Sequence, residues 1–362
     1  MPAYTYVDQA DRIRSRIDPY GTISVDTEFM REKTFFAQLC LIQISTPDEI
    51  FCVDPLSGSE LADFWTSLCG RQWVAHSARQ DIEVIYQSAG QMPKQLFDTQ
   101  VAAGLLGYQP QLGYAGLVKE LFDVELPKTH TRANWARRPL PDEYLEYAAE
   151  DVEYLLPACE ILTERLRDKG RLEWAIYDSN LLLDPALYEI DPTTAVQRLK
   201  GTRNFRGARR AAAALLAAWR ESEALERNLP RQWIIRDNVL TDIAYRLPGT
   251  QAELEGIEGL PAKVVQRAGA EILQLVEAAR ADETATTKPH SGNSGPPDDT
   301  QKAQLKAMQK RVAACASELG LAAETIASKK ELTSILLSGN RNSRVFSGWR
   351  NDLIGARLLE LL

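Results

Sequence analysis

Two carboxylates stand two residues apart in the stretch ISVDTEF, at Asp26 and Glu28. The surrounding residues favour a β-strand, and in a strand residues i and i+2 point to the same face. Neighbouring carboxylates repel each other and are costly to bury. Three interpretations are open for such a pair: a strand end that reaches solvent, a carboxyl pair that shares a proton for acid/base chemistry, or a site for hard divalent cations, which take oxygen ligands.

Another acid, Asp81, follows a short strand-like stretch and falls in the first turn of a predicted helix that begins near Ala78. Ile82 and Ile85 are expected to face the core from that helix. An acid in a first turn also interacts favourably with the helix dipole, so this position alone does not require chemistry.

Tyr147 and Asp151 are four residues apart in a long helical pattern, which places their side chains on one face. Several glutamates surround them, so a solvated polar stripe is the alternative interpretation. A metal site with more than one ion needs more than two oxygen donors, and Asp81 and Asp151 are the candidates to supply them.

The elements that must position these acids indicate an α/β fold, with a sheet covered by helices. Strand-like segments alternate early in the chain, and helical periodicity dominates later. The predicted strands cover 22–29, 37–46, 49–54 and 73–77, and the predicted helices cover 58–69, 78–90, 96–108, 113–122 and one long stretch, 142–170.

Length and composition bound the class of protein. The 362 residues allow two or three domains, and the net charge of −8 announces no polyanion partner, although a local basic face can be hidden in that total. The five cysteines form no C-x-x-C pair, which argues against a zinc site and fits a reduced cytoplasmic protein. The N-terminus lacks the apolar core of a secretory leader, and no apolar run is long enough to span a membrane, so we expect a cytoplasmic protein with no membrane partner.

The chain changes character near residue 193, where an almost wholly helical region begins. A stretch rich in Thr, Ser, Gly, Pro and Asp near residues 281–300 is typical of a flexible linker, and helical pattern resumes after it. We predict four parts: an α/β domain at 1–190, a helical domain at 193–281, a linker at 282–300, and a second, diverged helical domain at 301–362.

The order of these motifs resembles the DEDD family of 3′→5′ exonucleases, in its tyrosine-bearing branch, and within it the ribonuclease D family. The resemblance rests on VDTEFMREKTFFAQLCLIQIS, on EYAAEDVEYLLP, and on a Lys-x-x-x-Arg-x-x-Trp segment carried by Lys128, Arg132 and Trp135. It implies a ribonuclease H-like exonuclease domain, a mixed sheet flanked by helices, followed by two small all-α HRDC-type domains.

The resemblance also implies roles for the acids. Asp26, Glu28, Asp81 and Asp151 would hold two divalent metal ions, Mg²⁺ or Mn²⁺, which activate water and stabilise the leaving 3′-oxygen. Tyr147 would orient the attacking water, since an unperturbed phenol with a pKa of about 10 is a poor base.

Substrate contacts are expected from residues near the acids and from the helical region. Phe29 would stack on terminal bases, Gln38 would bond the terminal sugar, and Lys128 and Arg132 would contact phosphate; a core aromatic and solvated loop charges are the alternatives. Residues 198–236 carry ten Arg and Lys against three Glu, which indicates a basic face for RNA, with Arg206, Arg209 and Arg210 as candidate contacts; a solvated helical face is the alternative.

The resemblance therefore implies a metal-dependent 3′→5′ exoribonuclease that trims 3′ ends of tRNA precursors and other small structured RNAs and releases nucleoside 5′-monophosphates. A 3′→5′ DNA exonuclease on the same fold is one alternative, because the carboxylates do not read the 2′-OH. A non-catalytic RNA-binding protein is another. The sequence identifies no protein partner.

Overall fold

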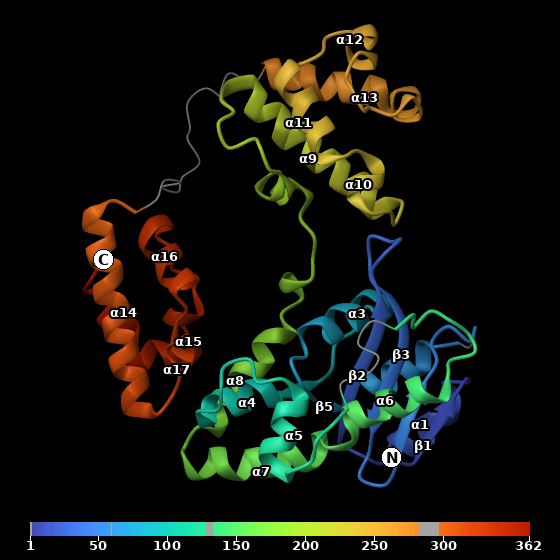
Figure 1. The fold of residues 1–362 in the computed structure, drawn as a ribbon, viewed down its shortest axis with the longest axis vertical. Coiled ribbons are helices and arrows are strands. Elements are labelled where there is room, and N and C mark those ends of the chain that lie inside the picture. Colours follow the sequence, from blue (N-terminus) through green and yellow to red (C-terminus); the bar gives the residue numbers. More distant parts are fainter. Residues whose placement is uncertain (1, 59, 128–132, 282–296) are drawn as a thin grey trace. The chain divides into compact units, whose positions relative to one another are not determined.

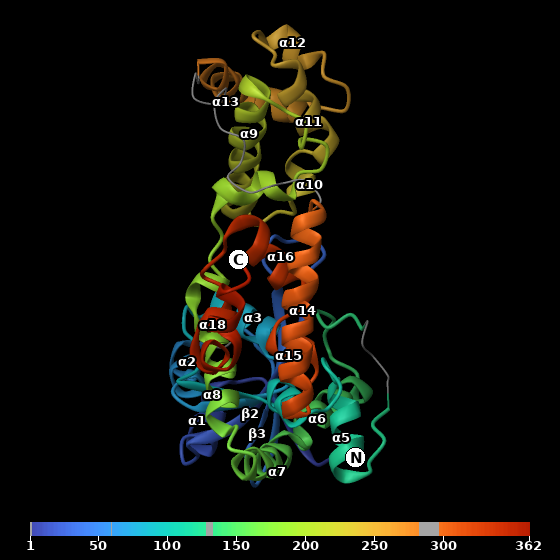
Figure 2. The same cartoon turned by 90° about the vertical axis from the view of Figure 1, so that its left-hand side faces the viewer.

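The computed structural model of the chain describes residues 2–58, 60–127, 133–281 and 297–362. The described residues fall into two compact units. Figures 1 and 2 show the chain coloured along its sequence. The first comprises 2–30, 38–188 and 297–362, and the second comprises 31–37 and 189–281. The short segment 31–37, although it lies between two strands in the sequence, thus belongs to the helical second unit.

A six-stranded mixed sheet forms the centre of the first unit, in the order β1-β4-β3-β2-β5-β6. β2 and β3 pair antiparallel, as do β3 and β4, whereas β1 with β4, β2 with β5, and β5 with β6 pair parallel. The predicted mixed sheet is therefore confirmed. The strands are β1 Tyr4–Val7, β2 Thr22–Met30, β3 Gln38–Ser45, β4 Ile50–Val53, β5 Gln72–Ala75 and β6 Gln95–Asp98.

Helices cover the sheet and bury its apolar residues. α6 packs across β2, β3 and β4, while α3 lies against β2 and β3. Ile82 and Ile85 of α3 are buried, as the sequence predicts. The helices of this part are α1 Asp11–Ile17, α2 Ala62–Cys69, α3 Arg79–Ala89, α4 Thr99–Leu106, α5 Tyr114–Phe122, α6 Asp142–Glu153, α7 Leu155–Asp168 and α8 Leu172–Asn180.

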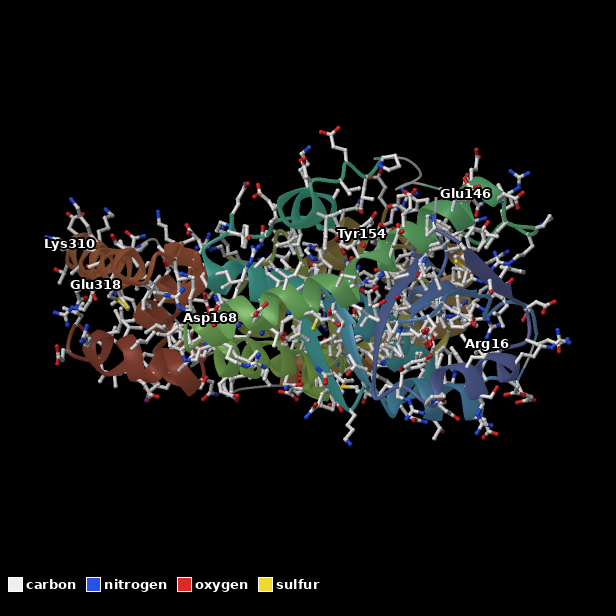
Figure 3. The ribbon with its side chains drawn as sticks, turned by 90° about the horizontal axis from the view of Figure 1, so that it is seen from below. Arg16, Glu146, Tyr154, Asp168, Lys310 and Glu318 are labelled. Carbon is white, nitrogen blue, oxygen red and sulfur yellow. The ribbon has the colours of Figure 1, made fainter. Side chains whose placement is uncertain are left out.

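Two predicted helices are corrected by the structure. The helix expected at 96–108 begins only at Thr99, because residues 95–98 form β6 and Asp98 caps the helix directly after it. The long helix expected at 142–170 is two helices, α6 and α7, that break at Tyr154 between them (Figure 3). Pro157 explains the break, since a proline has no N–H to donate and is tolerated only in the first turn of the new helix.

The second unit is helical around its own apolar core. Trp219 is buried there, whereas Trp233 is 60% exposed. Three 3₁₀ turns, at Leu181–Leu183, Pro185–Leu187 and Pro192–Arg198, precede or enter this unit. Its α-helices are α9 Gly207–Glu226, α10 Arg231–Ile234, α11 Asp237–Arg246, α12 Gln251–Glu255 and α13 Ala262–Ala281.

The C-terminal helices belong to the first unit and pack around a small core of their own. α14 begins at Asp299, inside the range predicted as linker, because Asp298 caps it through a capping box with Gln301. The remaining range of that predicted linker, 282–296, lies outside the described residues. The helices are α14 Asp299–Leu319, α15 Ala323–Ile326, α16 Lys329–Ser338, α17 Gly348–Arg350 and α18 Ala356–Leu359.

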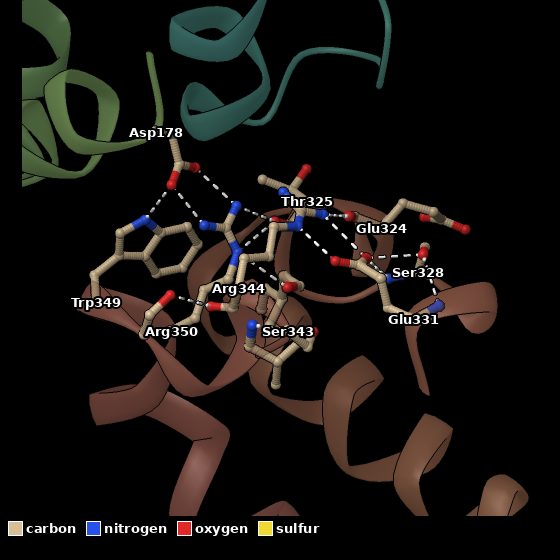
Figure 4. A network of polar contacts seen from close by, with 12 residues as sticks. Asp178, Glu324, Thr325, Ser328, Glu331, Ser343, Arg344, Trp349 and Arg350 are labelled. Carbon is tan, nitrogen blue, oxygen red and sulfur yellow. Dashed lines mark hydrogen bonds and ion pairs between the residues drawn. The ribbon is translucent and has the colours of Figure 1, made fainter. Parts of the chain in front are cut away.

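A buried polar network joins these C-terminal helices to α8 (Figure 4). Arg350 pairs with Asp178 through both terminal nitrogens of its guanidinium, Nη1 and Nη2. Trp349 stacks on Trp174 with ring centroids 4.5 Å apart. Arg171 donates to the carbonyls of Leu105 and Leu319, near the C-terminal ends of α4 and α14. One guanidinium thus satisfies carbonyls from two helix ends, where a cation also interacts favourably with both dipoles.

Candidate metal and active site

β2 places the first two acids together. Asp26 and Glu28 point to the same face of the strand, and each is half-buried. One carboxylate oxygen from each of Asp26, Glu28 and Asp151 lies within 4.8 Å of the others. Residues 125 positions apart in the sequence therefore supply one acidic cluster.

α6 brings Asp151 and Tyr147 over this face of the sheet. The Ser24 hydroxyl donates to the carbonyl of Val152, which ties the end of α6 to β2. Tyr147 donates to Asp151, one turn further along the helix. The Tyr147 ring packs near Trp135, whose buried indole lies with its centroid 6.2 Å away. Tyr147 thus packs against the apolar cluster that contains Trp135.

Asp81 arrives from a different direction and is not one of the three clustered acids. It lies in the first turn of α3, which follows β5, and β5 pairs with β2 only as far as Ser24. Asp81 is buried, and its Oδ1 accepts a hydrogen bond of 2.6 Å from the Thr27 hydroxyl. Its charge still acts on the cluster, because it raises the pKa of both Asp26 and Glu28.

Burial and mutual repulsion raise the pKa of every acid in this site. Burial, with the charges of Asp151 and Asp81, raises the pKa of Glu28 to about 9. Burial raises the pKa of Asp81 to about 7 against the hydrogen bond from Thr27, and that of Asp151 to about 7 against the hydrogen bond from Tyr147. The pKa of Asp26 is raised well above its usual range by burial and by its three acidic neighbours. Four such groups cannot all be ionised at neutral pH unless cations offset their charge.

Tyr147 remains a neutral phenol at neutral pH. Burial and the nearby charges of Asp151, Glu28 and Asp26 raise its pKa above the ordinary value. A phenol of raised pKa does not act as a base at neutral pH, but it can donate or accept a hydrogen bond. A neutral phenol at this position can therefore contribute hydrogen bonding rather than proton abstraction.

The donor set fits a hard divalent cation. Three carboxylates that converge within 4.8 Å, with a fourth beside them, are the oxygen ligands that Mg²⁺ and Mn²⁺ prefer. Beside them lies Gln43, fully buried, whose Oε1 and Nε2 have no hydrogen-bond partner among the residues that the structure describes. An unpaired amide next to an acidic cluster fits a site that is completed by a cation and its water.

The predicted substrate contacts are only partly described by the structure. Phe29 is half-buried near the end of β2, where the pairing with β3 shifts register between Glu28 and Phe29. Gln38 is exposed at the start of β3 and pairs with Met30. The predicted phosphate contacts Lys128 and Arg132 lie outside the described residues.

The basic segment 198–236 is less open than its composition indicates. Arg198 and Arg231 both pair with the buried Glu221, and Arg220 is itself buried and pairs with Asp237. Arg198, Arg220 and Arg231 thus pair with acids of the helical unit itself, and the predicted basic face for RNA stays a prediction.

The three arginines singled out from that segment, Arg206, Arg209 and Arg210, lie near the start of α9. Arg206 is exposed and donates to the carbonyls of Arg203 and Phe205, while Arg209 is exposed and lies over the Tyr245 ring. Arg210 is half-buried at the start of α9.

Sequence reasoning missed two residues of this site, Thr27 and Gln43. Thr27 points away from Asp26, and only the fold shows that Asp81 reaches it. Gln43 carried a signal in the sequence, because it is the one long polar side chain inside the apolar run LCLIQI. A polar residue at the centre of a buried strand needs a partner or a function.

Comparisons with known proteins agree with this geometry. A family model described as 3′-5′ exonuclease matches residues 4–167, and a model of the HRDC domain matches residues 209–276. Ribonuclease D of Gluconacetobacter diazotrophicus is 36% identical over 357 residues, which are 96% of this chain and 88% of that protein. Ribonuclease D of Nitrobacter hamburgensis is 33% identical over 370 residues, which are 100% of this chain and 95% of that protein.

A solved structure of a ribonuclease D has the same fold. The crystal structure of Escherichia coli RNase D, titled as an exoribonuclease involved in structured RNA processing, superposes with a TM-score of 0.85 at 28% identity, over 99% of this chain and 98% of that one. The sheet, the acidic cluster and the two family matches define a 3′-5′ exonuclease that carries an HRDC domain. The chain belongs to the ribonuclease D family.

Membership of this family gives the activity. The chain is a 3′-5′ exoribonuclease, as its resemblance to the family predicts. In the described ranges, no helix combines the length and the apolar character needed to cross a bilayer.

Proposed function

We propose that Asp26, Glu28, Asp81 and Asp151 hold two divalent ions, Mg²⁺ or Mn²⁺, and that the protein removes nucleotides one at a time from RNA 3′ ends as nucleoside 5′-monophosphates. The single observation that carries this proposal is the approach of three carboxylates to within 4.8 Å on one face of the sheet. Bound ions would supply an activated water and charge neutralisation at the scissile phosphate.

The chain's own residues would do the rest of the work. Asp26, Glu28 and Asp151 would hold the ions in a fixed place, since β2 and α6 are anchored to each other by Ser24 and Val152. Tyr147, neutral and supported by Trp135, would orient the attacking water. Apolar packing around Trp135, Leu145 and Ala148 keeps this side of the site free of bulk water.

Asp81 would join the ligands by a side-chain rotation. Its present partner is a hydroxyl rather than a cation, and the Thr27 hydroxyl can reorient at little cost because it rotates freely about its C–O bond. Release from Thr27 exchanges one hydrogen bond for a cation, which also removes the repulsion that Asp81 exerts on Asp26. Thr27 therefore acts in this proposal as a resting partner for the fourth ligand.

Structured RNA, including tRNA precursors, is the proposed substrate. The helical unit would hold phosphates through Arg206, Arg209 and Arg210, and Lys128 and Arg132 would add further phosphate contacts. Phe29 would stack on a terminal base and Gln38 would bond its ribose, because both lie at the ends of the strands that flank the acidic cluster. The similar Escherichia coli RNase D is described as an exoribonuclease involved in structured RNA processing, which supports structured RNA as the substrate.

Nucleotide release from a 3′-extended tRNA precursor tests this function. We expect mononucleotides to appear from the 3′ end with Mg²⁺ and none to appear with EDTA, and a matched DNA strand to be degraded more slowly. Asp26→Asn should abolish release, whereas Asp63→Asn, an exposed acid on α2, should not change it. Equal release by wild type and Asp26→Asn would contradict the proposal.

The salt dependence of binding tests the proposed RNA grip. Replacing Arg206, Arg209 and Arg210 by Gln should reduce the slope of log K against log salt by about 2, at about 0.7 per phosphate contact. The matched control replaces three exposed lysines of α14, Lys302, Lys306 and Lys310, which removes the same charge from another helix. Lys310 is labelled in Figure 3. An unchanged slope in the arginine variant would contradict the grip.

A further inference from the structure

Gln43 carries a buried amide that has no hydrogen-bond partner among the described residues. It lies at the centre of β3, is 0% exposed, and neither its Oε1 nor its Nε2 has a partner among the described residues. Its sequence neighbours Ile42 and Ile44 are buried apolar side chains. Because an unpaired buried amide destabilises a fold while an apolar side chain of the same shape would not, the amide needs a reason other than stability.

The strand register shows what this amide faces. Gln43 stands directly opposite Asp26 in the antiparallel pair of β2 and β3, so the two side chains lie on the same face. Cβ atoms of such pairs are about 4.5–5.5 Å apart, which a glutamine side chain spans with its amide. On its other side Gln43 stands opposite Cys52 of β4, and the Cys52 thiol is turned to the carbonyl of Leu145 in α6.

The alternatives for the amide are few. The Cys52 thiol donates elsewhere, and α6 covers the residues on that side with the apolar Leu145 and Ala148. The polar group beside the Gln43 amide is the acidic cluster, because Asp26, which stands opposite Gln43, belongs to that cluster. A carboxylate that is ionised by a cation offers acceptor oxygens beyond those that bind the ion.

We infer that Gln43 is a positioning residue of the metal site: its Nε2–H donates to the Asp26 carboxylate when that carboxylate holds a cation, and its Oε1 accepts from a water of the same site. Gln43 touches a ligand of the metal and not the metal itself. Groups that orient metal ligands in this way typically change metal affinity by about 10–100-fold when they are removed.

The test is Gln43→Met, which keeps the length of the side chain and removes both unpaired atoms. Unfolding is followed in EDTA, and Mn²⁺ is then titrated into the same protein by calorimetry. We expect a metal-free unfolding temperature equal to or above that of wild type, together with Mn²⁺ affinity weakened by about 10–100-fold. Stability and metal affinity would thus move in opposite directions, which a core residue of purely structural role cannot produce.

Gln87→Met is the matched control. Gln87 lies on α3, six residues beyond Asp81, and donates to Glu83 rather than facing the acids. It should leave Mn²⁺ affinity unchanged. Gln43→Glu adds a carboxylate that cannot donate when ionised, and it should raise the pH at which Mn²⁺ binds.

Three results would overturn the inference: Mn²⁺ affinity of Gln43→Met equal to that of wild type, an equal loss in Gln87→Met, or unfolding of metal-free Gln43→Met at a clearly lower temperature, since the amide would then be part of the core. The inference rests on the proposed metal site, and the two fail separately. Absence of Mn²⁺ binding by wild type would reject the site, whereas equal binding by both proteins rejects only the role of Gln43.

Discussion

Asp178 and Arg350 form a buried, two-pronged ion pair that joins α8 to the C-terminal helices, with N–O distances of 2.6 and 2.7 Å. Arg350 also donates to the carbonyls of Thr325 and Ile326, and Asp178 also accepts from the Trp349 indole (Figure 4). Every polar atom of the pair is thereby used, which is the condition under which a buried ion pair is tolerated. The C-terminal helices are therefore held in a fixed contact with the exonuclease domain.

Removing one partner of this pair should be costly. Arg350→Met leaves the buried Asp178 carboxylate without its positively charged partner, so we expect the free energy of unfolding to fall by about 3–5 kcal/mol. Urea unfolding measures it, with Arg341→Met, an exposed arginine of the same region, as control. A loss below that of the control would mean that the C-terminal helices do not depend on this pair.

Asn228 anchors the segment 31–37 within the helical unit. Its Oδ1 accepts from the backbone N–H groups of Phe35 and Phe36 at 3.1 and 3.0 Å, and its own φ of 46° is left-handed. Asn228→Gly keeps that backbone and removes the acceptor, so trypsin should cleave after Lys33 about fivefold to thirtyfold faster. Asn228→Asp retains an acceptor and should protect the segment as wild type does; equal cleavage in all three proteins would contradict the anchor.

The metal-free protein should lose stability as pH rises from 5 to 8. Asp81 and Asp151 have folded pKa values of about 7, above the roughly 3.9 of an unfolded chain, so the folded state holds protons that the unfolded state has released. Acids of lowered pKa, such as Glu331 at about 2, titrate below this window.

Urea unfolding in EDTA at several pH values checks this slope. We expect a fall of roughly a few kcal/mol across the window, which saturating Mg²⁺ should flatten because the cation favours the ionised acids. Asp151→Asn removes one of the titrating groups and should reduce the slope. A metal-free protein that becomes more stable between pH 5 and pH 8 would show that the acids are not packed together.

Tyr147→Phe tests the orientation of water. The ring keeps its packing against Trp135 and loses only the hydroxyl, so kcat should fall by about a hundredfold with little change in stability. Tyr144→Phe, one turn earlier on α6 and also near Trp135, should retain activity. The pH profile should keep its shape in Tyr147→Phe, because a phenol of raised pKa does not titrate in the working range; a changed profile would mean that Tyr147 acts as a base.

Local patterns predicted much of the exonuclease domain. Alternation in β2 indicated that Asp26 and Glu28 share a face, and helical spacing indicated the same for Tyr147 and Asp151, because both periods are fixed by backbone geometry. The strand β6 was missed because Asp98 is its last residue and also caps α4, so no turn separates strand from helix.

Contacts between residues far apart in the chain could not be predicted from the sequence. Arg350 and Asp178 are 172 positions apart, and nothing local marks a buried arginine. The place of segment 31–37 in the helical unit likewise depends on Asn228, far along the chain. Asp81 was expected beside the other acids, but its hydrogen bond to Thr27 follows from where β5 ends, which only the assembled sheet determines.

Calorimetric titration of Mn²⁺ at pH 8 into wild type and Asp151→Asn tests the central claim most directly, with Asp142→Asn at the exposed start of α6 as control. We predict saturable binding by wild type and by the control, and affinity at least about tenfold weaker in Asp151→Asn. Equal affinity in all three proteins would contradict the account, because the acids on β2 and α6 would then not be the ligands.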